Sequence, residues 1–156
     1  QTLVWSRMLM AKPQRVEQRD CYRIFFDVTT RWKDNDVYGH INNAVYNTWM
    51  DTAVTSMFMD TWLDLKDAPI IPVAVETKFT FRAPIEHPAQ VQTGLRVDRI
   101  GNRSVQCGTG VFQDSDDKAS AWGHMIHVFI DRATNIAVPI PDACRKLFED
   151  LMIKLQ

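Results

Sequence analysis

A long segment between Ile41 and Phe58 repeats apolar residues every three to four positions. The repeats form two adjacent rows: Ile41, Val45, Trp49, Ala53 and Met57, and then Tyr46, Met50, Val54 and Phe58. This spacing predicts an α-helix with a wide buried face. No proline or glycine interrupts the segment before Asp60, so we expect the helix to end between Asp60 and Asp67, ahead of Pro69.

Five other segments alternate apolar and polar residues, which is the pattern of half-buried β-strands. The first begins at Cys21 and leads into the helical segment. The other four follow Pro72, are separated by short turns rich in glycine, proline and aspartate, and span 73–82, 91–98, 103–112 and 122–130. The residues expected to face inward are Tyr22, Ile24, Phe26 and Val28 in the first strand, Val73, Val75, Thr77, Phe79 and Phe81 in the second, Val91, Thr93, Leu95 and Val97 in the third, Val105, Cys107, Thr109 and Val111 in the fourth, and Trp122, His124, Ile126, Val128 and Ile130 in the last.

One strand, a long helix and four closely spaced antiparallel strands predict an α+β domain in which the helix covers one face of the sheet. A length of 156 residues fits a single domain with a sizeable core. We expect an N-terminal arm over residues 1–19, the main domain over 20–140, and a C-terminal helix over 141–156 that Asp142 caps.

Composition excludes several classes of function. The net charge of −1 gives no basic patch for nucleic acid, and the apolar runs are far shorter than a membrane span. Three widely separated cysteines, Cys21, Cys107 and Cys144, indicate free thiols in a reducing compartment, so a cytoplasmic location is expected. The first residue is Gln1 and not methionine, which leaves open that a targeting segment was removed.

A polar turn directly before the predicted helix gathers the candidate chemistry. It contains Asp34, Asp36, Gly39, His40, Asn42 and Asn43. We expect Asn42 or Asn43 to cap the helix by accepting a backbone N–H. Unpaired N–H groups and the positive end of the helix dipole favour negative charge at this position. The turn therefore predicts an anion or oxyanion site.

Metal binding is not expected. Asp34 and Asp36 begin like a calcium loop, but Tyr38 occupies the position of the third oxygen ligand and Val45 that of the bidentate glutamate. The histidines at positions 124 and 127 are three apart on a predicted strand and therefore point to opposite faces.

The segment Asp34-Asn-Asp36-Val-Tyr-Gly39-His40-Ile-Asn42-Asn43-Ala-Val-Tyr46 resembles the signature of the 4-hydroxybenzoyl-CoA thioesterase-like hotdog family. The similarity extends over residues 20–140 and includes Phe81-Arg-Ala-Pro84 and Val138-Pro-Ile-Pro141. The His-Ile-Asn-Asn portion is also similar to a segment of plant acyl-ACP thioesterases. A branch linked to the Tol–Pal envelope system carries a catalytic histidine where this sequence has Asn43, so no role is carried over from that branch.

The resemblance implies a hotdog fold, a sheet of about five antiparallel strands around one long helix, and hydrolysis of acyl-CoA thioesters to a free acid and CoA. Asp36 would act as a base on water or as a nucleophile. Backbone N–H groups from His40 to Asn43 would hold the carbonyl oxygen, each worth about 3 to 4 kcal/mol of barrier. His40 would orient water or the carbonyl, act as the base, or hold the loop. Asp34 would shape the turn, and Asn42 and Asn43 would divide capping and substrate contact.

Residues for the rest of the substrate are less specific in sequence. Lys78, Arg82 and Arg103 are candidates for the CoA phosphates, and Gly39 and Tyr46 for contacts near the acyl group. Apolar residues suited to the acyl chain are Trp49, Met50, Phe58 and Phe79. No cofactor is expected besides the CoA of the substrate, because a thiolate leaves readily without a metal. The resemblance further implies a homodimer or homotetramer with active sites between subunits.

Two alternatives stay open at this point. The chain is an acyl-ACP thioesterase, or it is a non-catalytic module that binds acyl-CoA. The fold does not separate them, since related hotdog proteins dehydrate or only bind acyl groups. No Gly-x-Ser-x-Gly motif is present, which weakens a serine-hydrolase interpretation.

Overall fold

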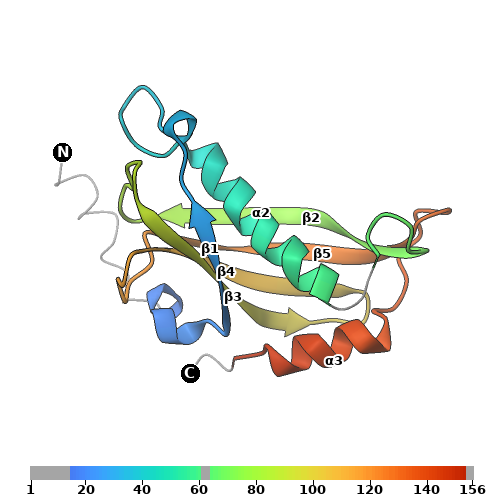
Figure 1. Cartoon of the computed structure of the whole chain (residues 1–156). Coiled ribbons are helices and arrows are strands. Elements are labelled where there is room, and N and C mark those ends of the chain that lie inside the picture. Colours follow the sequence, from blue (N-terminus) through green and yellow to red (C-terminus); the bar gives the residue numbers. More distant parts are fainter. Residues whose placement is uncertain (1–14, 61–63, 154–156) are drawn as a thin grey trace.

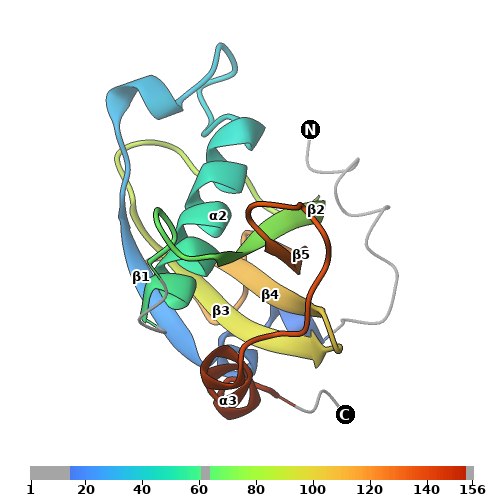
Figure 2. The same cartoon turned by 90° about the vertical axis from the view of Figure 1, so that its right-hand side faces the viewer.

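The computed structural model describes residues 15–60 and 64–153. A five-stranded antiparallel sheet has the order β1-β3-β4-β5-β2. Helix α2 lies across one face of this sheet, which curves around it, and α3 lies beside β3 (Figures 1 and 2). This confirms the predicted hotdog fold. The elements are β1 (Ile24–Thr29), α2 (Asn43–Asp60), β2 (Ile70–Phe81), β3 (Gln90–Ile100), β4 (Ser104–Gln113), β5 (Ala121–Asp131) and α3 (Asp142–Asp150), with 3₁₀ turns η1 (Arg15–Glu17), η2 (Arg19–Cys21) and η3 (Trp32–Asp34).

Helix α2 forms where the apolar period predicts it. Its buried residues are Tyr46, Trp49, Met50, Ala53, Val54, Met57 and Phe58. The opposite face is hydroxylated, and Thr48, Thr52 and Ser56 each donate to the carbonyl four residues earlier. The part of the predicted helix end that falls in residues 61–63 lies outside the described residues. The two faces of α2 thus separate core from polar surface.

The first strand begins at Ile24, and Tyr22 does not share a face with it as predicted. Tyr22 packs on the far side of the sheet from α2, in a second apolar cluster with Phe112. The reason is a trough of glycines on that face: a Cβ at Gly110 would lie 2.6 Å from the Tyr22 ring, and one at Gly94 would lie 2.9 Å from it. Glycine thus makes room for an aromatic ring that an alternating pattern places inside.

Strand β2 contains a β-bulge that the period-two pattern does not anticipate. Its pairing with β5 shifts between Ala74 and Glu76, which leaves Val75 as an extra residue that is 59% exposed. A bulge reverses which alternate residues face the core. Phe79 and Phe81 pack inward as predicted, but the inward placement of Val73 and Val75 is wrong.

The inward face predicted for β5 is also wrong. Residues Ala121, Met125, His127 and Phe129 are buried, whereas Trp122, His124, Ile126, Val128 and Ile130 are half-buried on the other face. Both alternate sets of this strand are apolar, so the pattern fixes a strand without fixing its face. Strands β3 and β4 do bury the residues predicted for them.

Helix α3 begins directly after Pro141, and Asp142 is its first residue, not its cap. No side chain caps the helix, so the prediction of an Asp142 cap is wrong. Proline fixes an extended entry into the helix, and Asp142 then lies in the first turn, where the helix dipole favours a carboxylate. The helix ends at Asp150, and the last predicted residues, 154–156, lie outside the described part of the chain. Within the described residues, none of the helices combines the length and the apolar character that a membrane crossing requires.

Candidate active site

The polar turn projects beyond the first turn of α2, between β1 and the helix (Figure 1). The Asp36 N–H donates to the His40 carbonyl over 2.8 Å, and the Gly39 N–H donates back to the Asp36 carbonyl over 3.0 Å. Gly39 has φ of +79°, a conformation that glycine adopts at little cost. These contacts place Asp36 and His40 opposite each other at the base of a tight turn.

One oxygen of the half-buried Asp36 carboxylate accepts a hydrogen bond from the Tyr38 N–H over 2.9 Å. Aspartate often shapes turns by bonding a backbone N–H two residues later. The other oxygen accepts no hydrogen bond from the residues that the structure describes. Asp36 therefore shapes the turn with one oxygen, and the second is available for another contact.

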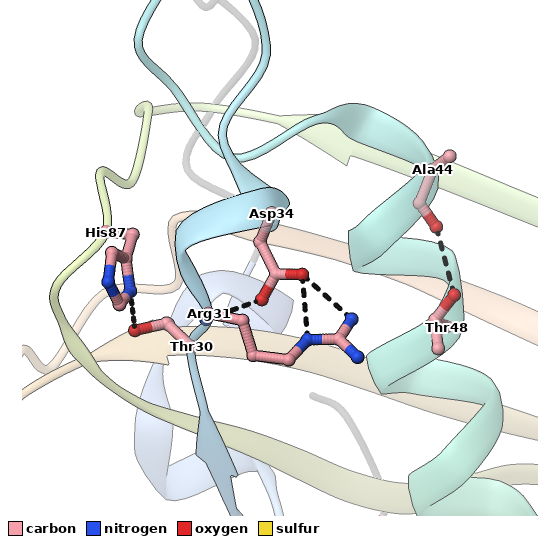
Figure 3. A network of polar contacts seen from close by, with 6 residues as sticks. All are labelled: Thr30, Arg31, Asp34, Ala44, Thr48 and His87. Atoms are coloured by element: carbon pink, nitrogen blue, oxygen red, sulfur yellow. Dashed lines mark hydrogen bonds and ion pairs between the residues drawn. The ribbon is translucent and has the colours of Figure 1, made fainter.

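Asp34 has a different environment, with only 1% of its surface exposed. Its carboxylate accepts hydrogen bonds from the Arg31 N–H, Nε and Nη2 over 2.8, 3.0 and 2.8 Å (Figure 3). Burial acts to raise the pKa of Asp34, but the hydrogen bonds from Arg31 outweigh it and hold the pKa below the ordinary value. The Asp34 carbonyl also accepts the Asn42 N–H. Asp34 is thus the internal brace of the turn, and Arg31 is a partner that the sequence analysis missed.

A second loop, residues 83–89 after β2, clamps the base of the turn. The Ile41 N–H donates to the Ile85 carbonyl over 2.7 Å, and the His87 N–H donates to Asn35 Oδ1 over 3.0 Å. The His87 side chain is held in turn, with Nδ1 2.9 Å from Thr30 Oγ1 (Figure 3). Nothing in the spacing of the sequence indicates these contacts, because the fold brings the two loops together.

The start of α2 offers fewer N–H groups than the sequence predicts. The N–H groups of Ile41, Asn42 and Ala44 donate to the Ile85 carbonyl, the Asp34 carbonyl and Asn42 Oδ1. The N–H groups of His40 and Asn43 donate no hydrogen bond within the described part of the chain. Asn42 is therefore the helix cap, and the Asn43 side chain is exposed at the start of the helix.

The His40 side chain lies within ion-pair distance of Glu86. Its Nε2 lies 3.5 Å from Glu86 Oε1, with 43% of the histidine side chain and 69% of the glutamate side chain exposed. Glu86 belongs to the clamping loop and was not predicted as a site residue.

Tyr46, expected near the acyl group, is a core residue in this chain. It is 2% exposed, and its ring lies 5.4 Å from Trp49 and 5.2 Å from Phe81. Burial raises the pKa of Tyr46 to about 12, so its hydroxyl stays protonated. Gly39, in contrast, is exposed, with open space where a Cβ would stand.

The structure does not bring the three basic candidates together. Lys78 lies on the sheet face away from α2, paired across the strands with His124. The Arg82 Nε donates to the Ala119 carbonyl over 2.7 Å. Arg103 lies in the turn between β3 and β4, at the opposite end of the sheet from Arg82.

Asp36 does not line any of three hollows formed by the described residues around the sheet. One of about 280 Å³ lies between β1 and α2, and its lining includes Trp49 and Arg31. One of about 370 Å³ contains Lys78, and a third of about 960 Å³ follows β1 and β3. Within residues 15–60 and 64–153, no three histidine, cysteine or acidic side chains gather as a metal site requires.

Solved structures share this architecture over most of the chain. The PA5185 protein from Pseudomonas aeruginosa is 35% identical with a TM-score of 0.87, over 90% of this chain and 99% of that one. A 1,4-dihydroxy-2-naphthoyl-CoA thioesterase from Synechocystis is 17% identical with a TM-score of 0.74, over 81% and 96%. A Thermus thermophilus thioesterase, solved with coenzyme A and zinc, is 24% identical with a TM-score of 0.73, over 85% and 96%. The last two similarities concern the fold alone.

No curated protein matches the sequence. The model of the thioesterase-like superfamily matches residues 30–148, which include the polar turn, α2, all strands from β2 to β5, and most of α3. The chain therefore belongs to the thioesterase-like superfamily.

Proposed function

We propose that this protein hydrolyses acyl-CoA thioesters, with Asp36 as the general base or nucleophile. The observation that carries the proposal is that an acceptor oxygen and two N–H donors, without partners in the described part of the chain, lie at the base of the same turn. Asp36 has a carboxylate oxygen without a partner, while the N–H groups of His40 and Asn43, next to it along the same turn, are without acceptors among the described residues. A thioester carbonyl needs an attacking group and oxyanion donors of this kind.

The reaction follows from these groups. In one route Asp36 takes a proton from water, which attacks the carbonyl carbon; in the other its oxygen attacks and forms a mixed anhydride that water then cleaves. In both routes the carbonyl oxygen becomes negative and is held by the N–H groups of His40 and Asn43. The CoA thiolate leaves, and the free acid remains.

A groove between β1 and α2 is the best candidate for the acyl group. Its walls are both apolar and hydroxylated, and Arg31, the partner of Asp34, stands at its side. The lining residues are Phe26, Asp27, Val28, Thr29, Arg31, Thr48, Trp49, Thr52 and Ala53. Of the residues proposed for the acyl chain from sequence, Trp49 lies here, while Met50 and Phe58 are buried in the core.

We further propose a homodimer in which a second copy completes the site. Two observations support it. Asp36 does not line any of the three hollows described above, and the tip of its turn exposes 95% of Val37 and 81% of Tyr38. Strands β1 and β2 form the two edges of the sheet, and edges with unpaired backbone groups favour association. Because the chain has an odd number of widely separated cysteines, we propose a reducing, cytoplasmic setting.

The test is a panel of acyl-CoA thioesters scored for free thiol release. Asp36→Asn is expected to lower kcat at least about a hundredfold, the typical contribution of a general base, while the unfolding midpoint stays near wild type. Matched acyl-ACP substrates decide the carrier: faster turnover of acyl-ACP would assign the chain to that class.

Asp64→Asn is the matched control, because Asp64 also accepts a backbone N–H two residues later in an exposed turn, from Lys66. This variant is expected to keep wild-type kcat. Bound acyl-CoA without any released thiol, together with indifference to Asp36→Asn, would show a non-catalytic binding module instead.

A further inference from the structure

We infer that Glu86 is a positioning residue that sets the ring of His40 so that Nδ1 accepts a hydrogen bond from the attacking water. The inference rests on the proposed function, in which His40 has several possible roles. Glu86 comes from the loop after β2, 46 residues from His40 in the chain. Its Oε1 lies 3.5 Å from His40 Nε2.

The clamp between the two loops fixes where Glu86 stands. The residues on either side of Glu86 are bonded to the residues on either side of the turn. The Ile85 carbonyl accepts the Ile41 N–H, and the His87 N–H donates to Asn35 Oδ1. Asn35 and Ile41 also form a bridge across the base of the turn. Glu86 is therefore centred on the turn that carries the candidate carboxylate, and its nearness to His40 follows from the backbone.

The charge of Glu86 selects one form of the imidazole. A neutral histidine carries one N–H and one lone pair, on different ring nitrogens. A lone pair on Nε2 would face a carboxylate oxygen, so the proton belongs on Nε2. Nδ1 is then left with the lone pair and acts as an acceptor.

This form of the ring assigns His40 one of the roles that the sequence left open. An acceptor at Nδ1 orients a water molecule, whose hydrogens it can bind, but has no proton to offer a carbonyl oxygen. The carbonyl oxygen is held by the N–H groups of His40 and Asn43, which are without acceptors in the described residues. Glu86 thus acts on water through His40, and no proton transfer to Glu86 is required.

A spectroscopic test needs no activity. Long-range proton–nitrogen spectra identify which ring nitrogen of each histidine carries the proton, at about pH 8.5, two units above the ordinary histidine pKa. Wild-type His40, assigned by its loss in His40→Gln, is expected with the proton on Nε2, and Glu86→Ala is expected to shift it toward a mixture. The matched control is Glu76→Ala, because Glu76 Oε1 lies 2.6 Å from His124 Nε2 on the far face of the sheet. Glu76→Ala should change the ring-nitrogen signals of His124 alone.

The kinetic test separates positioning from general structure. Glu86→Ala is expected to lower kcat about two- to fivefold, the range for one partly exposed ion pair, with KM near wild type. Glu86→Gln keeps an acceptor oxygen and should restore most of kcat, and Glu86→Ala should have no further effect in a His40→Gln background. Two results would overturn the inference. One is an unchanged His40 spectrum in Glu86→Ala, and the other is a Glu86→Ala effect on kcat that is as large in the His40→Gln background as in wild type. Absence of thiol release from every substrate would instead reject the proposed function, and the spectra would still decide the role of Glu86.

Discussion

At the scale of single residues, the two aspartates of the turn show how surroundings separate two chemically identical groups. Both carboxylate oxygens of Asp34 accept hydrogen bonds from Arg31, and the side chain is buried inside the loop. One carboxylate oxygen of Asp36 accepts a hydrogen bond from the Tyr38 N–H, and the residue is only half-buried. A carboxylate that must approach a substrate needs an available oxygen, and of these two only Asp36 has one.

His127 provides a prediction at the same scale. It is 5% exposed, its ring lies edge-on to Phe58 at 5.0 Å, and its Nδ1 has no hydrogen-bond partner in the described structure. Burial lowers the pKa of His127 to about 4, against which Asp51 acts weakly in the opposite direction. The unfolded chain, with a histidine pKa of about 6.5, therefore binds more protons between these values.

Stability attributable to His127 is accordingly present above about pH 6.5 and is lost as the pH falls toward about 4, by about 3 kcal/mol. Urea unfolding of wild type and His127→Leu across this range measures it, and the variant is expected to lose less stability on acidification. His124→Gln, on the other face of β5, is the control and should follow wild type. Equal acid sensitivity of wild type and His127→Leu would contradict the assignment.

What the sequence reveals about single residues depends on how far apart the partners are in the chain. The choice of an asparagine as helix cap follows from local spacing and could be predicted. Glu86 and His87 could not, because they reach the turn from another loop, 46 or more residues away from His40 in the chain. Arg31 was within reach, since it lies three residues before Asp34 and could have been tested as its partner.

At the scale of elements, periodicity predicts the type of an element better than its orientation. Helix α2 has one apolar and one hydroxylated face, so its buried side was predicted from the sequence. Strand β5 is apolar on both faces, and β2 changes face at Val75, so their inward sides depend on pairing that no local pattern contains. The glycines beneath Tyr22 likewise decide the face on which the segment before β1 packs, and no local pattern shows it.

The polar turn is also a structural element, and the contribution of the Asp34–Arg31 contacts to its stability can be tested. Asp34→Asn replaces the acceptor of three hydrogen bonds from Arg31, so we expect a loss of about 2 kcal/mol in the free energy of unfolding at pH 7. Because the pKa of Asp34 is lowered in the folded chain, this stabilisation is present above the ordinary aspartate pKa of about 3.9 and disappears as the pH falls below it. Urea unfolding at pH 7 and pH 3 measures both parts.

Arg31→Lys serves as the companion variant, since lysine keeps the charge but loses the two-pronged geometry. It should lie between wild type and Asp34→Asn in stability. If Asp34→Asn unfolds at the same urea concentration as wild type at pH 7, Asp34 does not brace the turn. Both variants should also lower kcat, because the Asp34 carbonyl holds the Asn42 N–H at the start of α2.

At the scale of the whole molecule, a single chain presents the catalytic candidates without enclosing them. The turn stands beyond the N-terminal end of α2 (Figure 1). Val37 in this turn is 95% exposed, and Trp32, in η3 before it, is 84% exposed. Exposed apolar groups of this size beside a candidate site are characteristic of an interaction surface. The proposed second copy of the chain would cover them and wall the site.

Light scattering after size exclusion should therefore give twice the mass of one chain, and the thermal midpoint should rise with protein concentration, because association stabilises the folded form. Val37→Glu places a charge on the proposed contact and is expected to weaken the dimer and to lower kcat together. Ile136→Glu makes the same change at a residue that is 65% exposed near the far end of β5, and it should leave both unchanged. A monomer that hydrolyses acyl-CoA at the wild-type rate would show that one chain builds the whole site, because kcat would then not depend on the partner.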